Sequence, residues 1–270
     1  MTATQRRKYL SILGVEAGPP SRAELANLIR THVLAVPFEN ISKLYYAKVL
    51  GEKGLPTLDR YLEGIARHNF GGTCSSNNYY LFSLLGHLGY EAKFCGSDMS
   101  QPDSHTVIVV SIDGGEFLVD VGYGAPFFAP LPLDLDSPHT VGFGGDRYVL
   151  KPRDQNGYSR LELHRDGKHA HGYLVKPYPI EQDQFASFVR ESFMETATFM
   201  NGTLLVRYFP DHAVRLHNFS LTESTATTAS TVNLASLEEL VAVIVKRFGI
   251  TEQVVRKATA GMQAFRDVFH

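Results

Sequence analysis

A β-hairpin predicted in the middle of the chain limits the choice of fold more than any other feature of the sequence. The stretches HTVIVVSI (105–112) and EFLVDVGY (116–123) flank Asp113-Gly114-Gly115, and an Asp-Gly pair between apolar runs is typical of a tight hairpin turn. Similar strand patterns follow at DRYVLKP (146–152), RLELHRDGKHAHGYLV (160–175) and NGTLLVRYF (201–209). The middle of the chain is therefore expected to form an antiparallel sheet.

Helical patterns lie on both sides of this strand-rich region. Apolar residues before it recur at spacings of three and four, and the last of these predicted helices begins near Ser75 and stops at Gly89. A final helix is expected from Ser236 to a stop at Gly249. The polar run TESTATTAST (222–231) reads most simply as a surface loop. Helices followed by strands indicate an α+β fold.

Composition excludes several classes of partner. The formal net charge of the 270 residues is −2, so neither nucleic acid nor an anionic membrane surface is an expected partner. No apolar run approaches the roughly 20 residues of a membrane helix, and the polar start MTATQRRKYL lacks the apolar core of a signal peptide, so a cytoplasmic location is expected. The two cysteines form neither a disulfide framework nor a zinc motif, and we expect no metal site.

One of these cysteines stands at a reactive position. NFGGTCSSNNYY (69–80) places Cys74 behind a glycine pair and at the expected start of a helix, where unpaired backbone N–H groups and the helix dipole favour a thiolate. Gly71 and Gly72 allow a sharp turn and let a substrate approach the backbone. Because the thiolate is the nucleophilic form, Cys74 is a candidate nucleophile. A buried structural cysteine is the alternative, and it is the interpretation we favour for Cys95.

A nucleophilic cysteine needs a base and a group that orients the base. Of the eleven histidines, the hairpin selects His105. If Asp113 and Gly114 form a two-residue turn, His105 and Asp120 share a face at roughly 5 to 8 Å between Cβ atoms, whereas a three-residue turn would put Asp120 on the other face. Asp120 also lies in an apolar run, where an unpaired carboxylate would be costly to bury. Each is an ordinary strand-end residue when taken alone, but together with Cys74 they predict a triad.

Further motifs connect this predicted triad with a known family. The chain carries VPFENI (36–41), GGTC with Asn78 four residues beyond the cysteine, and VDVGYG (119–124) followed by PLPL (130–133). In these motifs, and over nearly its whole length, the chain resembles the arylamine N-acetyltransferases. Its histidine lies too close to its cysteine for a papain-type protease.

The resemblance implies an α+β fold with a cysteine-protease-like Cys-His-Asp core. Its expected parts are a helical N-terminal subdomain carrying the nucleophile (1–90), a central antiparallel β-barrel-like subdomain carrying the histidine and aspartate (91–190) and a C-terminal α/β lid (191–270). Small molecules are the expected partners, and the oligomeric state is left open.

The resemblance also implies a ping-pong reaction. Cys74 would take the acetyl group of acetyl-CoA, a substrate rather than a permanently bound cofactor, and pass it to the nitrogen of an arylamine, hydrazine or N-hydroxyarylamine. The expected substrate-binding residues are Phe38, Gly72, Thr73, Gly122, Tyr123 and Gly124. Two alternatives keep the triad: an amide synthase acting on a longer carrier- or CoA-bound acyl chain, and a thioester hydrolase. A binding module without activity would predict a damaged triad.

The chain departs from the family pattern close to this site. The family carries an arginine four residues before the cysteine, where this chain has Phe70. The resemblance implies that this arginine pairs with the glutamate of VPFEN, which is Glu39 in this chain. Arg60 or Arg67 could replace the missing cation, or Glu39 could be protonated or solvated. Glu39, Phe70 and Asn78 are therefore treated as structural residues near the site, and an arginine in place of Phe70 is expected to stabilise the fold.

Overall fold

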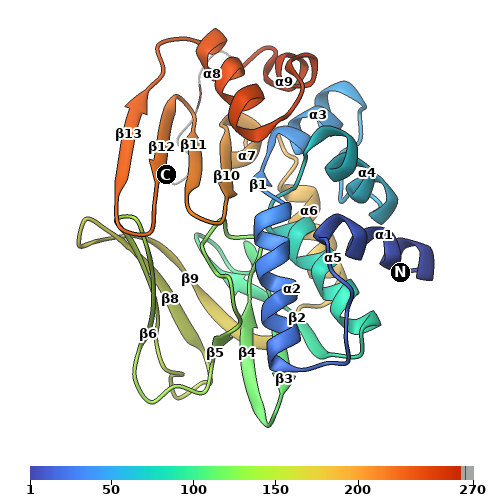
Figure 1. The fold of residues 1–270 in the computed structure, drawn as a ribbon, viewed down its shortest axis with the longest axis vertical. Helices are drawn as coiled ribbons and strands as arrows, with labels where there is room; N and C mark the ends of the chain where they lie inside the picture. Colours follow the sequence, from blue (N-terminus) through green and yellow to red (C-terminus); the bar gives the residue numbers. More distant parts are fainter. Residues whose placement is uncertain (263–264, 266–270) are drawn as a thin grey trace.

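The computed structural model describes residues 1–262 and residue 265, and Figure 1 shows how its elements are arranged. The N-terminal part consists of helices, with a two-residue strand between the second and third helix. The first, second, fourth and fifth helices share one apolar core, whereas the third buries most of its apolar side chains against the C-terminal part. These elements are α1 (Ala3–Leu13), α2 (Arg22–Ala35), β1 (Phe38–Glu39), α3 (Ile41–Val49), α4 (Leu58–His68) and α5 (Cys74–His87). Helix α5 packs against the central sheet, which brings the start of this helix close to the strands.

Capping residues set the ends of these helices. The Ser21 hydroxyl oxygen accepts from the Glu24 N–H at 3.1 Å, and the Thr57 hydroxyl oxygen accepts from the Arg60 N–H at 3.3 Å. Helix α4 ends at Asn69, which adopts the left-handed conformation with φ +52°. The chain turns there toward the glycine pair that precedes α5.

The central part is a curled antiparallel sheet (Figure 1). Among the described residues it contains eight strands in the order β5-β4-β3-β2-β9-β8-β7-β6. Their bounds are β2 (Glu91–Asp98), β3 (His105–Ile112), β4 (Gly115–Val119), β5 (Leu131–Pro132), β6 (His139–Phe143), β7 (Asp146–Leu150), β8 (Ser159–Arg165) and β9 (Lys168–Pro179). Apolar side chains from most of these strands fill its interior. A sheet curled around its own core in this way is barrel-like.

The predicted hairpin lies between β3 and β4. Ile112 pairs with Gly115, so that Asp113 and Gly114 form a two-residue turn with φ of +52° and +77°. Positive φ at both central residues is what a type I′ turn requires. The predicted register is confirmed, and the end of β4 lies beside the start of β3, where His105 is located.

A second antiparallel sheet and its helices form the C-terminal part, with strand order β1-β10-β11-β12-β13. The elements are α6 (Gln182–Glu191), α7 (Thr198–Asn201), β10 (Leu204–Tyr208), β11 (Ala213–His217), β12 (Ser220–Ser224), β13 (Ala229–Asn233), α8 (Leu237–Val243), the π-helix η1 (Ile244–Phe248) and α9 (Glu252–Thr259). Phe38 of β1 pairs with Val206 of β10, so the VPFEN stretch belongs to this sheet as well. The division at 1–90, 91–190 and 191–270 stays a prediction.

One local prediction was wrong, and a predicted helix was correct in its bounds but was not the last helix. The run 222–231 is not one loop, because its ends belong to β12 and β13 and the hydroxyls of Thr222 and Thr231 lie 2.8 Å apart across the pair. The helix after Ser236 changes to π-helical form before Gly249, and an unexpected further helix, α9, follows it.

Candidate active site

Cys74 is the first residue of α5 and is 7% exposed. The preceding residue, Thr73, does not cap the helix with its side chain, and its hydroxyl oxygen lies 3.3 Å from that of Ser75. The first turn also carries no acidic residue. The positive end of the helix dipole at Cys74 is therefore not neutralised by a side chain of the first turn.

Close backbone packing fixes the position of this cysteine. A Cβ on Gly122 would lie 2.5 Å from the Cys74 Cα, and a Cβ on Gly71 would lie 1.8 Å from the Pro37 carbonyl oxygen. The Thr106 hydroxyl donates to the Cys74 carbonyl oxygen at 3.2 Å. A larger residue at either glycine would push apart the VPFEN, GGTC and VDVGYG segments that meet at the sulfur.

His105 lies between an aspartate and the cysteine. Its Nε2 lies 2.8 Å from Asp120 Oδ2, and both residues are 2% exposed. Cys74 interacts with the same ring through its charge and through a side-chain hydrogen bond, which leaves Nδ1 as the nitrogen on the sulfur side. Burial by itself would lower the pKa of His105, but the charges of Asp120 and Cys74 outweigh it and raise this pKa to about 10. The imidazole is thus held protonated beside the sulfur at neutral pH.

Asp120 is held as a carboxylate by several donors. Oδ1 accepts from Asn78 Nδ2 at 2.8 Å and from the Gly122 N–H at 2.9 Å, while Oδ2 also accepts from the Tyr173 hydroxyl at 2.7 Å. Burial by itself would raise the pKa of Asp120, but the charge of His105 and the hydrogen bonds from His105, Asn78 and Tyr173 lower it. A buried carboxylate with this many donors stays ionised and keeps the imidazole oriented.

The chain as a whole matches a known family. The sequence profile of the N-acetyltransferase family matches residues 22–257, which is most of the chain. The chain belongs to the arylamine N-acetyltransferase family. Membership of this family confirms the prediction of an acyltransferase of the arylamine N-acetyltransferase type.

Curated relatives support the assignment over different lengths. The pineal gland isozyme NAT-10 of arylamine N-acetyltransferase from Gallus gallus is 31% identical over 130 residues, which cover 44% of this chain and 43% of that relative. The pineal gland isozyme NAT-3 from the same species is 24% identical over 263 residues, which cover 86% of this chain and 88% of that relative. The chain thus aligns with less than half of the first relative and with most of the second.

Solved structures of the family have the same fold. The arylamine N-acetyltransferase from Salmonella typhimurium gives a TM-score of 0.79 at 20% identity, covering 96% of this chain and 99% of that one. The Mycobacterium marinum arylamine N-acetyltransferase in complex with CoA gives a TM-score of 0.77 at 21% identity, covering 93% and 97%. The predicted α+β fold is confirmed.

Asn78 connects the motifs of this arylamine N-acetyltransferase family member. Besides Asp120, its Nδ2 donates to the Thr106 carbonyl oxygen at 2.6 Å, and its Oδ1 accepts from the Val121 N–H at 2.8 Å. One side chain on α5 is therefore hydrogen bonded to β3 and to the segment after β4. Asn78 was expected to be structural, and its contacts are consistent with that expectation.

Sequence reasoning missed Tyr173 of β9, whose hydroxyl bonds Asp120. The alternation in HAHGY places it on the same face as His171, whose Nδ1 lies 2.9 Å from the Tyr123 hydroxyl. The Tyr123 ring lies 5.7 Å from the ring of His105. Burial, followed by the positive charge of His105, lowers the pKa of His171 to about 4. An aromatic layer with a neutral histidine thus lies behind the triad.

The expected substrate-binding residues Phe38, Gly72 and Gly124 lie around the triad. Phe38 forms an isolated bridge with Gly72, and its ring is 5.8 Å from that of Phe199. A Cβ on Gly124 would lie 3.4 Å from the Phe38 ring. Gly124 also lines a hollow of about 210 Å³ between the curled sheet and the C-terminal sheet. The role of these residues, and of Thr73, Gly122 and Tyr123, in binding substrate stays a prediction.

Neither arginine proposed as a partner for Glu39 reaches it. Arg60 pairs with Glu52 at 2.9 Å and Arg67 pairs with Glu63 at 2.9 Å, so both predictions were wrong. Glu39 is fully buried, so the alternative of a solvated carboxylate was wrong too. No cation among the described residues forms an ion pair with Glu39.

Backbone donors hold Glu39 instead. Its Oε1 accepts from the Gly71 N–H at 3.0 Å and its Oε2 from the Ser42 N–H at 2.9 Å, and burial raises its pKa more than these bonds lower it. Of the three alternatives, protonation of Glu39 is the one that stays a prediction. Phe70 is 1% exposed and packs with ring distances of 6.1 Å to Tyr45 and 5.8 Å to Tyr46. Aromatic side chains therefore surround the position where the family has its arginine.

In the part of the chain that the structure describes, Cys95 forms no second reactive site and the metal-ligating residue types form no metal site. Cys95 is fully buried in the curled sheet, and burial raises the pKa of its thiol to about 12. No group of three or more His, Cys, Asp or Glu side chains within residues 1–262 is arranged to hold a metal ion. None of the helices described has the length and apolar character needed to cross a membrane.

Proposed function

We propose that this chain transfers an acetyl group from acetyl-CoA, through a thioester on Cys74, to the nitrogen of an arylamine, hydrazine or N-hydroxyarylamine. The observation that supports it most directly is the position of His105 between Asp120 and Cys74. The Mycobacterium marinum relative, solved in complex with CoA, supports a CoA thioester as the donor.

In the first half-reaction, the Cys74 sulfur attacks the carbonyl carbon of the acetyl thioester. The new carbon–sulfur bond forms while the bond to the coenzyme A sulfur breaks, and protonated His105 gives its Nδ1 proton to the departing thiolate. Asp120 keeps Nε2 engaged, so that Nδ1 remains the nitrogen that exchanges protons near Cys74.

In the second half-reaction, the acceptor nitrogen attacks the same carbonyl carbon, now bound to Cys74. His105, neutral after giving up its proton, accepts a proton from the attacking nitrogen while Cys74 leaves as a thiolate. The amide product departs and the thiolate–imidazolium pair is restored. Arylamine nitrogens are weakly basic and remain nucleophilic at neutral pH, so they suit a site that supplies its own base.

The proposal includes the catalytic triad Cys74, His105 and Asp120, with Phe38 as a wall of the acceptor pocket. We also keep the expectation of a cytoplasmic location, because the reaction needs a reduced Cys74 and the cytosol keeps thiols reduced.

Intact-protein mass spectrometry tests the proposal. Brief exposure to acetyl-CoA without acceptor should add one acetyl group to the wild-type protein and none to Cys74→Ala, while Cys95→Ala should be acetylated like wild type. Adding an arylamine or hydrazine should remove the group and yield the matching amide.

Each alternative predicts a different result in this experiment. A thioester hydrolase would lose the acetyl group to water at the same rate with and without amine. An amide synthase for longer chains would remain unmodified by acetyl-CoA and accept a longer acyl-CoA or a carrier-bound chain. Acetylation of Cys74→Ala would contradict the role of Cys74 itself.

A further inference from the structure

One buried charge near the triad is not used by the proposed mechanism. Lys43 lies on α3 and is only 7% exposed. Its Nζ donates to the Ser192 hydroxyl oxygen at 2.6 Å and lies 4.1 Å from the centre of the Phe193 ring. None of the described carboxylates forms an ion pair with it. An ammonium group buried without a counter-ion is costly, so its presence calls for a function.

Lys43 and Phe38 both contact the segment that follows α6. Phe38 forms a bridge with Gly72, two residues before Cys74. Asn40, between Phe38 and Lys43 in the sequence, donates to the Phe199 carbonyl oxygen at 2.9 Å, and the Phe199 ring contacts Phe38. One segment therefore connects Lys43 with Phe38, which lies beside the stretch that carries the cysteine.

The ammonium group has unused capacity for an anion. Burial lowers the pKa of Lys43 to about 8, against the charge of Cys74, which acts to raise it, so the group is still mostly protonated at neutral pH. An ammonium has three N–H donors, and the Ser192 hydroxyl accepts one of them. The face of Phe193 offers the cation a weak partner that bears no charge.

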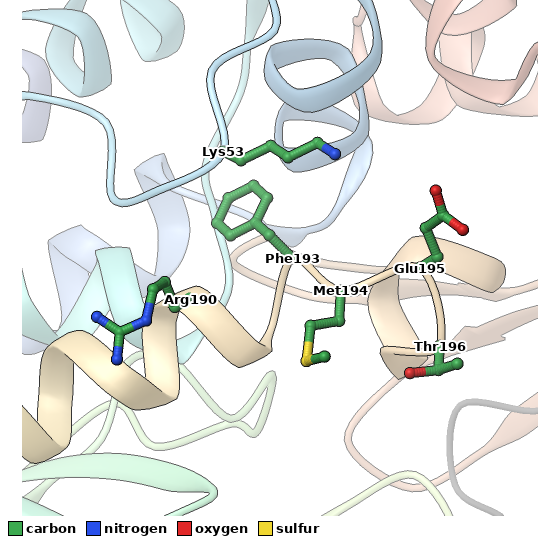
Figure 2. Close-up of a pocket in the computed structure, with 6 residues that line it drawn as sticks. All are labelled: Lys53, Arg190, Phe193, Met194, Glu195 and Thr196. Atoms are coloured by element: carbon green, nitrogen blue, oxygen red, sulfur yellow. The ribbon is translucent and has the colours of Figure 1, made fainter.

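The partners of Lys43 come from the segment that follows α6. Ser192 and Phe193 lie in the turns between α6 and α7 rather than in a helix or strand. Figure 2 shows Phe193 on this segment, with its ring near Lys53, beside an open hollow of about 500 Å³. Ser192 is also the C-cap of α6, and its hydroxyl donates to the Val189 carbonyl oxygen at 2.7 Å, so a carboxylate would bind beside this hydroxyl at Nζ.

We propose that Lys43 pairs with a carboxylate of a substrate, carried either by the acceptor amine or by the acyl group of the thioester. The inference rests on the proposed function, because it places one part of a substrate that reacts at Cys74 against Lys43. An acetyl group and a plain arylamine have no anionic group to offer. An aminobenzoate or a dicarboxylic acyl thioester does, and it would provide the missing counter-ion.

Two pairs of substrates distinguish the two sources of the carboxylate. In the acceptor arm, kcat/KM for 4-aminobenzoate is compared with that for its ethyl ester, using acetyl-CoA. In the acyl arm, succinyl-CoA is compared with butanoyl-CoA, using an uncharged arylamine. Wild type should prefer the charged member in one arm, and Lys43→Met should reduce that preference roughly 10- to 100-fold. Lys48→Met, at an exposed lysine of the same helix, should keep the wild-type preference.

Two kinetic outcomes overturn the proposal. One is the absence of a charge preference in both arms. The other is an equal fall of activity with charged and neutral substrates in Lys43→Met, which would show that Lys43 acts on Cys74 rather than on substrate.

If no transfer occurs with any substrate, that result contradicts the proposed function. A binding measurement then decides whether Lys43 binds a carboxylate. Thermal unfolding is then followed with benzoate and with succinate, each against its amide. Stabilisation of wild type by the carboxylate but not the amide, lost in Lys43→Met, supports the carboxylate site. No stabilisation of wild type by either carboxylate overturns it.

Discussion

The side-chain amide nitrogen of Asn78 lies 2.8 Å from Asp120 Oδ1, and this contact joins the helix that carries Cys74 to the strand end that carries the aspartate. The same amide bonds the backbone of Thr106 and Val121. The distance between nucleophile and base thus depends on one buried side chain as well as on the packing of α5 against β3. It follows that a residue without chemistry of its own affects the rate.

Replacing Asn78 should therefore lower both stability and activity. Asn78→Ala leaves the Val121 N–H and the Thr106 carbonyl oxygen without these partners and removes a donor to Asp120, which should reduce the free energy of unfolding by about 1 to 3 kcal/mol. Urea unfolding and the rate of Cys74 acetylation measure the two effects. Asn27→Ala, at an exposed position on α2, should match wild type. Wild-type acetylation by Asn78→Ala would show that the contact does not hold the triad.

The sequence predicted those parts of the site that local periodicity controls. His105 and Asp120 belong to one hairpin with a two-residue turn, and since side chains alternate with period two the turn length alone decides that they share a face. Cys74 was predicted because a glycine pair and a helix start are signals of neighbouring residues.

Residues that depend on distant pairing were not predictable in this way. Tyr173 reaches Asp120 through the pairing of β2 with β9, which contains a register shift between Cys95 and Ser97 that no local pattern shows. The partner of Lys43 is Ser192, 149 residues further along the chain. The state of Glu39 likewise depends on what surrounds it after folding.

Tyr173 should act as a positioning residue for the triad. Tyr173→Phe keeps the ring but removes the hydroxyl that donates to Asp120 Oδ2, so the carboxylate is less firmly held against His105. Hydrogen bonds to charged groups contribute about 1.5 to 3 kcal/mol, so kcat should fall roughly tenfold or more, with KM little changed. Steady-state kinetics checks this split. Tyr178→Phe, at a 57% exposed tyrosine, is the control, and equal kcat in all three proteins would contradict the positioning role.

Restoring the family arginine at Phe70 should destabilise this protein. The sequence alone suggested a gain, because Glu39 lacks a cation, but Phe70 packs against Tyr45 and Tyr46 and Glu39 already accepts from backbone N–H groups. Phe70→Arg loses this packing and buries a guanidinium among aromatic rings, so its melting temperature should fall clearly below that of wild type.

Phe70→Leu serves as the comparison, because it keeps an apolar side chain and should lose less stability than the arginine variant. Thermal unfolding of both variants measures the difference. A melting temperature of Phe70→Arg above that of wild type would mean that the arginine pairs with Glu39 despite the aromatic neighbours.

Protonation of His105 should make stability depend on pH. The pKa of His105 is raised from 6.5 to about 10 on folding, so its stabilising contribution is fully present below pH 6.5 and is lost as the pH rises through about 10. The free energy of unfolding should then fall more steeply between these pH values for wild type than for His105→Gln. Urea unfolding at constant ionic strength measures both slopes.

Cys74→Ala tests the cause of this raised pKa. The variant removes the Cys74 interactions that raise the pKa of His105 and leaves Asp120, so the fall of stability should still begin near pH 6.5 but should level off at lower pH than in wild type. Asp120 affects stability in the opposite sense. Because its pKa is lowered on folding, its contribution to the free energy of unfolding is present above pH 3.8 and is lost as the pH falls. Equal slopes for wild type and His105→Gln across the alkaline range would contradict a protonated His105 in the folded protein.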